Sequence, residues 1–70
     1  MNKLVNVWRL DGSFVLGGVM TVSTLGDCLI ERDFPVDDTF VARLKLMYQE
    51  TVHSAWIDYV GPLKIQVCPI

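Results

Sequence analysis

Residues that could perform catalysis are few in this chain of 70 amino acids, which holds one histidine and two cysteines. The polar neighbours of His53 in the sequence do not show the spacing of a nucleophile with its general base. Cys28 could act as a nucleophile beside His53, but only the presence of both residues favours that pairing. We therefore predict that the protein is not an enzyme and that it has no catalytic residues.

The sequence gives equally little support for a metal site or a phosphate-binding site. Cys28, His53 and Cys68 lack the closely spaced ligand pairs of structural zinc sites, so we expect two free thiols and no metal. Gly17-Gly18 lacks the lysine and hydroxyl residue of a phosphate-binding loop, and we expect no cofactor. A cluster of carboxylates could bind a cation, but a solvated loop is the preferred interpretation; its members are Glu31, Asp33, Asp37 and Asp38.

Aromatic residues are the remaining candidates for chemistry, because bases of single-stranded nucleic acids stack on exposed rings. Trp8, Tyr48, Trp56 and Tyr59 could do so, although core or interface positions are commoner for aromatic residues in so short a chain. The net charge is −2 and the isoelectric point is about 5.0, and the basic residues are scattered. These values argue against strong, non-specific binding to a nucleic-acid backbone.

Composition predicts a single domain, residues 1–70, that associates with copies of itself. Hydrophobic residues make up 51% of the chain and the mean hydropathy is +0.38, whereas a chain this short has little interior in which to bury them. No apolar run approaches the roughly 20 residues of a membrane-spanning helix, and the first residues do not resemble a signal peptide. We expect a cytoplasmic protein with no membrane partner.

Short segments rich in β-branched residues predict four of the strands, which are Leu4 to Leu10, Ser13 to Thr24, Cys28 to Phe34 and Leu63 to Cys68. Asp11-Gly12 predicts a tight hairpin turn between the first two, because glycine tolerates a positive φ. Gly17-Gly18 predicts a sharp bend within the second strand, so that Gly17→Val should disrupt folding. Leu25 to Asp27 predicts a further turn before the third strand.

The stretch from Thr39 to Val60 is ambiguous. As a strand, it places Phe40, Leu44 and alternate residues between and beyond them on one face. As a helix, it places Phe40 and Leu44 in an apolar stripe, with Asp37 or Asp38 as the N-cap. We prefer the strand interpretation because the flanking segments are predicted strands.

The first half of the chain resembles the first motif of the Sm, LSm and Hfq families, through Val5, Val7, Asp11-Gly12, Gly17, Val19, Val22, Leu29 and Ile30. The second half is similar to their second motif, through Trp56, Ile57, Val60, Gly61, Leu63, Ile65 and Val67. The resemblance implies a mostly β fold, a small and strongly bent antiparallel five-stranded Sm-like (SH3-like) barrel. Only three residues precede the first predicted strand, so we expect the barrel to lack the usual N-terminal helix.

The resemblance also implies a ring of identical subunits, in which the last two strands of neighbouring subunits pair. The implied interface residues are Trp56, Ile57, Tyr59, Leu63, Ile65 and Val67, although each could instead fill the subunit's own core. Single-stranded RNA would then be contacted near the pore by Thr24, Leu25, Asp27 and Gly61. Asp27 and Val60 stand where Sm proteins carry the asparagine and arginine that hold a base, and Ser54-Ala55 replaces the lysine-histidine pair of Hfq.

Two hypotheses follow. The first is a homo-oligomeric, ring-forming Sm-like protein that binds RNA weakly or with specialised specificity. The second is a ring-forming interaction or structural module, from a phage or mobile element, that has lost RNA binding.

Overall fold

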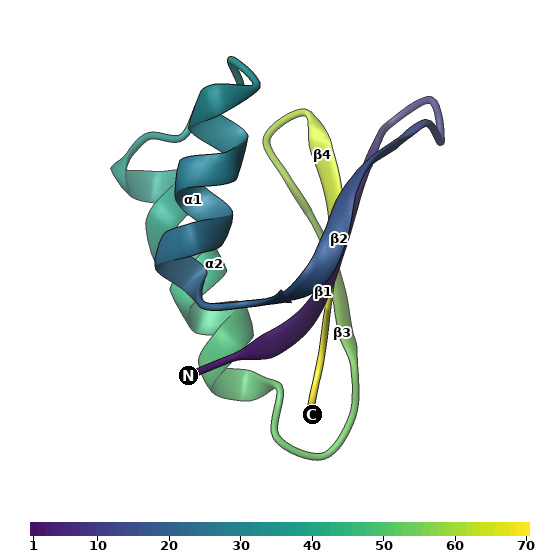
Figure 1. The fold of residues 1–70 in the computed structure, drawn as a ribbon, viewed down its shortest axis with the longest axis vertical. Helices are drawn as coiled ribbons and strands as arrows, with labels where there is room; N and C mark the ends of the chain where they lie inside the picture. Colours follow the sequence, from purple (N-terminus) through teal and green to yellow (C-terminus); the bar gives the residue numbers. More distant parts are fainter.

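The computed structural model describes all 70 residues, and it places two helices on one face of a four-stranded antiparallel sheet (Figure 1). The elements in chain order are β1 (Lys3–Arg9), β2 (Phe14–Met20), α1 (Val22–Glu31), α2 (Asp38–Glu50), β3 (Trp56–Val60) and β4 (Leu63–Cys68). The strand order is β2-β1-β4-β3, so β1 and β4 are central and β2 and β3 are the edges. The expectation of a small, β-rich domain is confirmed.

The β1–β2 hairpin forms where the sequence predicted it. The Asp11 carboxylate accepts hydrogen bonds from the hydroxyl and the backbone N–H of Ser13, at 2.6 and 2.9 Å. These bonds stabilise the turn, and the one from the hydroxyl contributes most to lowering the pKa of Asp11. The hairpin therefore owes its position to local chemistry within the turn.

Helix α1 replaces the turn predicted at Leu25 to Asp27 and most of the strand predicted at Cys28 to Phe34, and both predictions are wrong. The Thr21 side chain caps the start of this helix by accepting a backbone hydrogen bond of 3.2 Å. Leu25 and Leu29 are fully buried, and residues four apart share one face of a helix. The cap and this spacing outweigh the strand propensity of the individual residues.

Helix α2 replaces the first half of the strand preferred for Thr39 to Val60, so that interpretation is wrong there and the helical alternative is confirmed. Asp37 is the N-cap, and its carboxylate accepts a 2.8 Å hydrogen bond from the backbone N–H of Phe40. Phe40, Leu44 and Met47 are buried at helical spacing. The last five residues of the ambiguous stretch form strand β3.

The five-stranded barrel expected from the resemblance is wrong, because the sheet has four strands and its edges β2 and β3 do not meet. The two helices cover the sheet face from which alternate residues of β4, Leu63, Ile65 and Val67, project into the core. Because the helices bury this inner face, the sheet does not have to close on itself. The structure is therefore a two-layer arrangement (Figure 1).

Lys3 ties the start of β1 to the end of α2. Its ammonium group is buried and donates a 2.5 Å hydrogen bond to the carbonyl of Thr51, the residue that ends the helix. A cation at this position also interacts favourably with the helix dipole. The contact joins the end of α2 to the sheet at the start of β1.

Candidate functional site

The sheet face turned away from the helices, called the outer face below, carries three rows of side chains. Strand pairing defines them, because residues opposite one another on neighbouring strands project to the same face. The aromatic row is Phe14, Trp8, Lys64 and Tyr59; the amide row is Gly17, Asn6, Gln66 and Ile57; the apolar row is Val19, Leu4 and Cys68. Each full row thus crosses all four strands.

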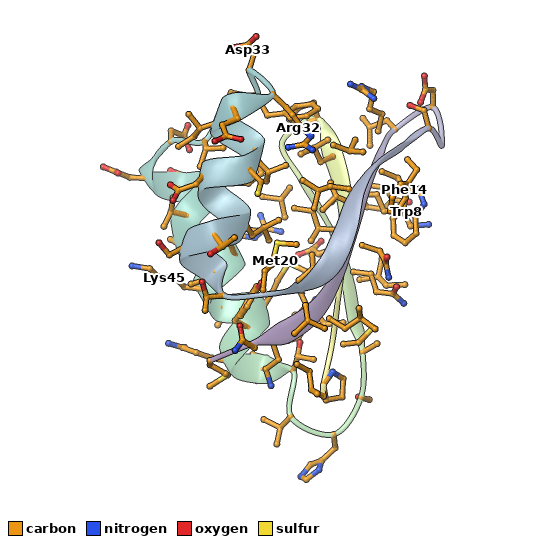
Figure 2. All side chains as sticks on the ribbon, in the orientation of Figure 1. Trp8, Phe14, Met20, Arg32, Asp33 and Lys45 are labelled. Carbon is orange, nitrogen blue, oxygen red and sulfur yellow. The ribbon has the colours of Figure 1, made fainter.

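The aromatic row combines three rings with one ammonium group. The rings of Trp8 and Phe14 meet edge to face, with centroids 6.1 Å apart and planes at 72°. The Nζ of Lys64 lies 5.5 Å from the centroid of the Trp8 ring, a cation–π arrangement. Tyr59 is 61% exposed at the edge strand. Figure 2 shows Trp8 and Phe14 on the side of the sheet opposite the helices.

A β-bulge brings Phe14 to this face. Val7 pairs with Leu16 and Trp8 pairs with Phe14, so Val15 is an extra residue without a partner. Because side chains alternate along a strand, the extra residue reverses the direction of everything before it. Phe14 consequently joins Trp8 on the outer face.

Gly17 makes room for this arrangement. A Cβ atom at Gly17 would lie 2.9 Å from Cζ of Phe14 and 2.7 Å from Oδ1 of Asn6. The positive φ of the pair belongs to Gly18, at 148°, rather than to Gly17. The two glycines are therefore needed for different reasons: Gly17 allows close packing, and Gly18 adopts a positive φ.

The amide row lies directly beside the aromatic row. Nδ2 of Asn6 donates a 3.2 Å hydrogen bond to Oε1 of Gln66 on the neighbouring strand. Both side chains are half-buried. Polar hydrogen-bonding groups thus occupy the centre of a face that is otherwise aromatic and aliphatic.

A cavity of about 290 Å³ opens at the hairpin end of the aromatic row, and its lining residues are Trp8, Arg9, Leu10, Gly12, Tyr59 and Lys64. The guanidinium of Arg9 lies 5.5 Å from the ring of Phe34, in the segment between the two helices. Lys64 is therefore the cation that the aromatic row itself contributes. The cavity combines aromatic walls with the cationic side chains of Arg9 and Lys64, which suits a planar ligand with negative charge.

Carboxylates are segregated from the outer face, since none belongs to its three rows. Those of the helices and the segments beside them are Asp27, Glu31, Asp33, Asp37, Asp38 and Glu50. Asp11 lies in the hairpin turn, and Asp58 forms an ion pair of 2.5 Å with Arg43 of α2. That hydrogen-bonded pair holds the pKa of Asp58 below its usual value. The net negative charge of the chain therefore does not describe the outer face.

The six interface residues predicted from the resemblance divide into two sets. Those on β4, which are Leu63, Ile65 and Val67, are completely buried in the subunit's own core. Those on β3 are exposed, and Ile57 and Tyr59 belong to the outer face. The residues of β3 alone remain available to a partner.

The structure does not gather the four predicted RNA contacts into one exposed loop. Thr24, Leu25 and Asp27 belong to α1, and Leu25 is fully buried. Gly61 lies in the β3–β4 turn, where a Cβ atom would be 3.4 Å from the Phe40 ring. The segment that was expected to form the pore-side loop is helix α1 instead, and its Leu25 side chain packs in the core.

Sequence reasoning identified Trp8 and Tyr59 as possible stacking residues but missed Phe14, Lys64 and the Asn6–Gln66 pair as their neighbours. The Asp-Gly turn sets an approximate register for the hairpin, which could have placed Phe14 near Trp8. The neighbours on β4 could not be found, since their pairing with β1 joins segments distant in sequence; Asn6 and Gln66, for example, are 60 residues apart.

The remaining candidate groups lie apart from one another. His53 is exposed in the segment between α2 and β3, and Cys28 and Cys68 are both free. No three side chains among histidine, cysteine, aspartate and glutamate lie together as metal ligands. Neither helix has the length and apolar character needed to cross a membrane.

Comparison with known proteins does not indicate a function, so function has to be inferred from the outer face. No family model, curated protein or solved structure matches the chain. The resemblance to Sm-like proteins therefore stays a prediction.

Proposed function

We propose that the protein binds single-stranded RNA on the outer face of its sheet. The observation that carries the proposal is the aromatic row, in which three rings and one lysine cross four adjacent strands on an uncovered face. Single-stranded RNA is recognised by aromatic side chains on four-stranded sheets, where unstacked bases lie flat on the rings. The helices behind the sheet hold this platform rigid.

The chemistry of each side chain in the aromatic row indicates what it would contribute to RNA binding. Tyr59 and Phe14, which are 61% and 56% exposed, offer ring surface for bases, and each stacked base contributes about 1 to 3 kcal/mol. The Trp8 ring, in contrast, already contacts Phe14 and Lys64. Lys64, which lies between Phe14 and Tyr59 in the row, can attract a backbone phosphate. Because the three rows contribute a single cation, binding should depend weakly on salt, with a slope of about −0.7 in log K against log salt for one released ion.

The test is fluorescence anisotropy with short uridine-rich and adenine-rich oligonucleotides at low salt. Tyr59→Ala should weaken binding about 5- to 150-fold, the equivalent of about 1 to 3 kcal/mol for one lost stacking contact. Leu46→Ala is the matched control, because Leu46 is an exposed apolar residue of the helical layer.

Charge provides a second pair of variants. Lys64→Gln should flatten the salt dependence, whereas Lys45→Gln should not, since Lys45 projects from α2 on the other side of the molecule (Figure 2). If the wild-type protein binds neither oligonucleotide at low salt, the proposal is wrong.

Self-association through the same outer face is the second candidate, and it is favoured by the apolar side chains that this face exposes. Val19, Ile57 and Leu4 are at least 39% exposed there. A face of four strands spaced about 4.8 Å apart and about 20 Å long covers roughly 400 Å² in projection. Stable interfaces bury about 800 Å² from each partner, so the homo-oligomer would be weak and would depend on concentration.

A ring joined at the sheet edges is the finer form of this second candidate. The bulge at Val15 and the short β3 disfavour edge pairing, since both are devices that protect edge strands. Solution mass by light scattering, with and without RNA, separates the cases. A face-to-face dimer should dissociate when RNA binds, and an edge-joined ring should keep its mass.

The free cysteines support a reducing compartment such as the cytoplasm.

A further inference from the structure

We propose that the Asn6–Gln66 pair determines specificity by hydrogen bonding to the Watson–Crick edge of a base stacked on the aromatic row. This inference rests on the proposed binding of single-stranded RNA. It assigns the two rows different tasks, since the rings would hold any base and the amides would recognise the polar edge of a pyrimidine such as uracil.

The position of the pair fits this task. Asn6 precedes Trp8 by two residues on β1, and Gln66 follows Lys64 by two residues on β4, so each amide lies beside a member of the aromatic row on the same face. Two residues of a strand span about 7 Å. A base stacked on the aromatic row can therefore extend its polar edge toward the amides.

The hydrogen-bonding groups of the pair are only partly used. One hydrogen bond joins Asn6 to Gln66, which consumes one donor and one acceptor. The Oδ1 acceptor and the second Nδ2–H donor of Asn6, and both N–H groups of Gln66, have no other hydrogen-bond partner in the protein, so the pair still offers donors and an acceptor to a ligand. Uracil presents the complement, an N3–H donor next to the O4 acceptor.

Burial makes these free groups selective. Asn6 and Gln66 are half-buried between the aromatic row and the apolar row. A ligand that covered them without hydrogen bonding would remove their water and leave them unpaired, which is unfavourable. A base with a matching edge avoids this penalty, whereas an apolar ring of the same size does not.

Gly17 keeps the Asn6 side chain in position. The amide oxygen of Asn6 occupies the space in which a side chain at Gly17 would begin, at 2.7 Å from its Cβ position. The bond to Gln66 fixes the other end of the amide. Asn6 is thus ordered before a ligand arrives, which reduces the entropy lost on binding.

The experiment compares oligouridylate with the same oligonucleotide built from N3-methyluridine, which stacks but cannot donate from N3. Wild-type protein should prefer the unmodified strand by about 2- to 12-fold, the equivalent of one hydrogen bond. Asn6→Leu keeps the approximate size of the side chain but removes the free carbonyl acceptor, and it should bring this preference close to one. Tyr59→Ala should weaken both strands and leave the preference unchanged.

The outcomes are distinguishable. Equal binding of both strands by the wild type would overturn base reading while RNA binding stood. An undiminished preference in Asn6→Leu, with a thermal melt showing that the variant is folded, would also overturn it. Binding of neither strand would remove the proposed function and this inference together.

Discussion

Replacement of Gly17 by alanine should destabilise the protein by overpacking the outer face. The new Cβ atom would lie 2.7 Å from Oδ1 of Asn6, 2.9 Å from Cζ of Phe14 and 3.2 Å from the carbonyl oxygen of Val5. The first two atoms end side chains that can rotate away, but the third belongs to the backbone of a central strand. We therefore expect a loss of about 1 to 2 kcal/mol, within the lower part of the range for overpacked sites.

Thermal unfolding followed by circular dichroism measures this loss. In a domain of this size, about 1 to 2 kcal/mol corresponds to a melting temperature lower by about 4 to 16 °C. Gly26→Ala is the control, because Gly26 lies within α1 and nothing is within 4 Å of its Cβ position. This second variant should gain about 0.4 to 1 kcal/mol, since alanine restricts the unfolded chain.

A double-mutant cycle identifies the cause. In a Phe14→Ala background, Gly17→Ala should cost less, because the ring that it displaces is gone. If Gly17→Ala melts at the wild-type temperature, Phe14 and Asn6 do not pack over Gly17, and the ordered amide row is wrong.

Three further variants test other parts of the structure. Leu25→Ala should cost about 2 to 5 kcal/mol in urea unfolding, since Leu25 is a fully buried core residue of α1; a loss below about 0.5 kcal/mol would indicate an exposed loop instead. Burial raises the pKa of Tyr48 from 10.0 to about 12, so its contribution to stability should be constant below pH 10 and be lost between pH 10 and 12, and Tyr48→Phe should abolish that loss. Arg43→Ala should cost at most about 1 kcal/mol at neutral pH because its ion pair with Asp58 is largely exposed, and this difference from wild type should disappear as the pH falls through the lowered pKa of Asp58.

Elements with strong local signals could be predicted from the sequence. The Asp11-Gly12 turn, the strand before it and the alternating strand that ends at Cys68 are present where they were predicted, and the strand after the turn is present as far as Met20, whereas its predicted end, Val22 to Thr24, belongs to α1. Turn residues and two-residue periodicity act over a few positions, so they can be recognised without knowledge of the rest of the chain.

The helices show where local signals were insufficient. The segment around Leu29 and the segment around Leu44 both have apolar residues that suit either a strand or a helix. The caps at Thr21 and Asp37, and the need to cover the inner face of the sheet, decide for the helix. Which apolar face is buried depends on contacts with strands distant in sequence, and this information is absent from a short window.

The outer face was decided only by the tertiary structure. The pairing of β1 with β4 brings Trp8 beside Lys64 and Asn6 beside Gln66, and one bulge residue turns Phe14 to the same side. Composition indicated a surplus of apolar surface, but not its location. Because a one-residue change of register moves every side chain to the opposite face, only the folded sheet determines which residues share the candidate site.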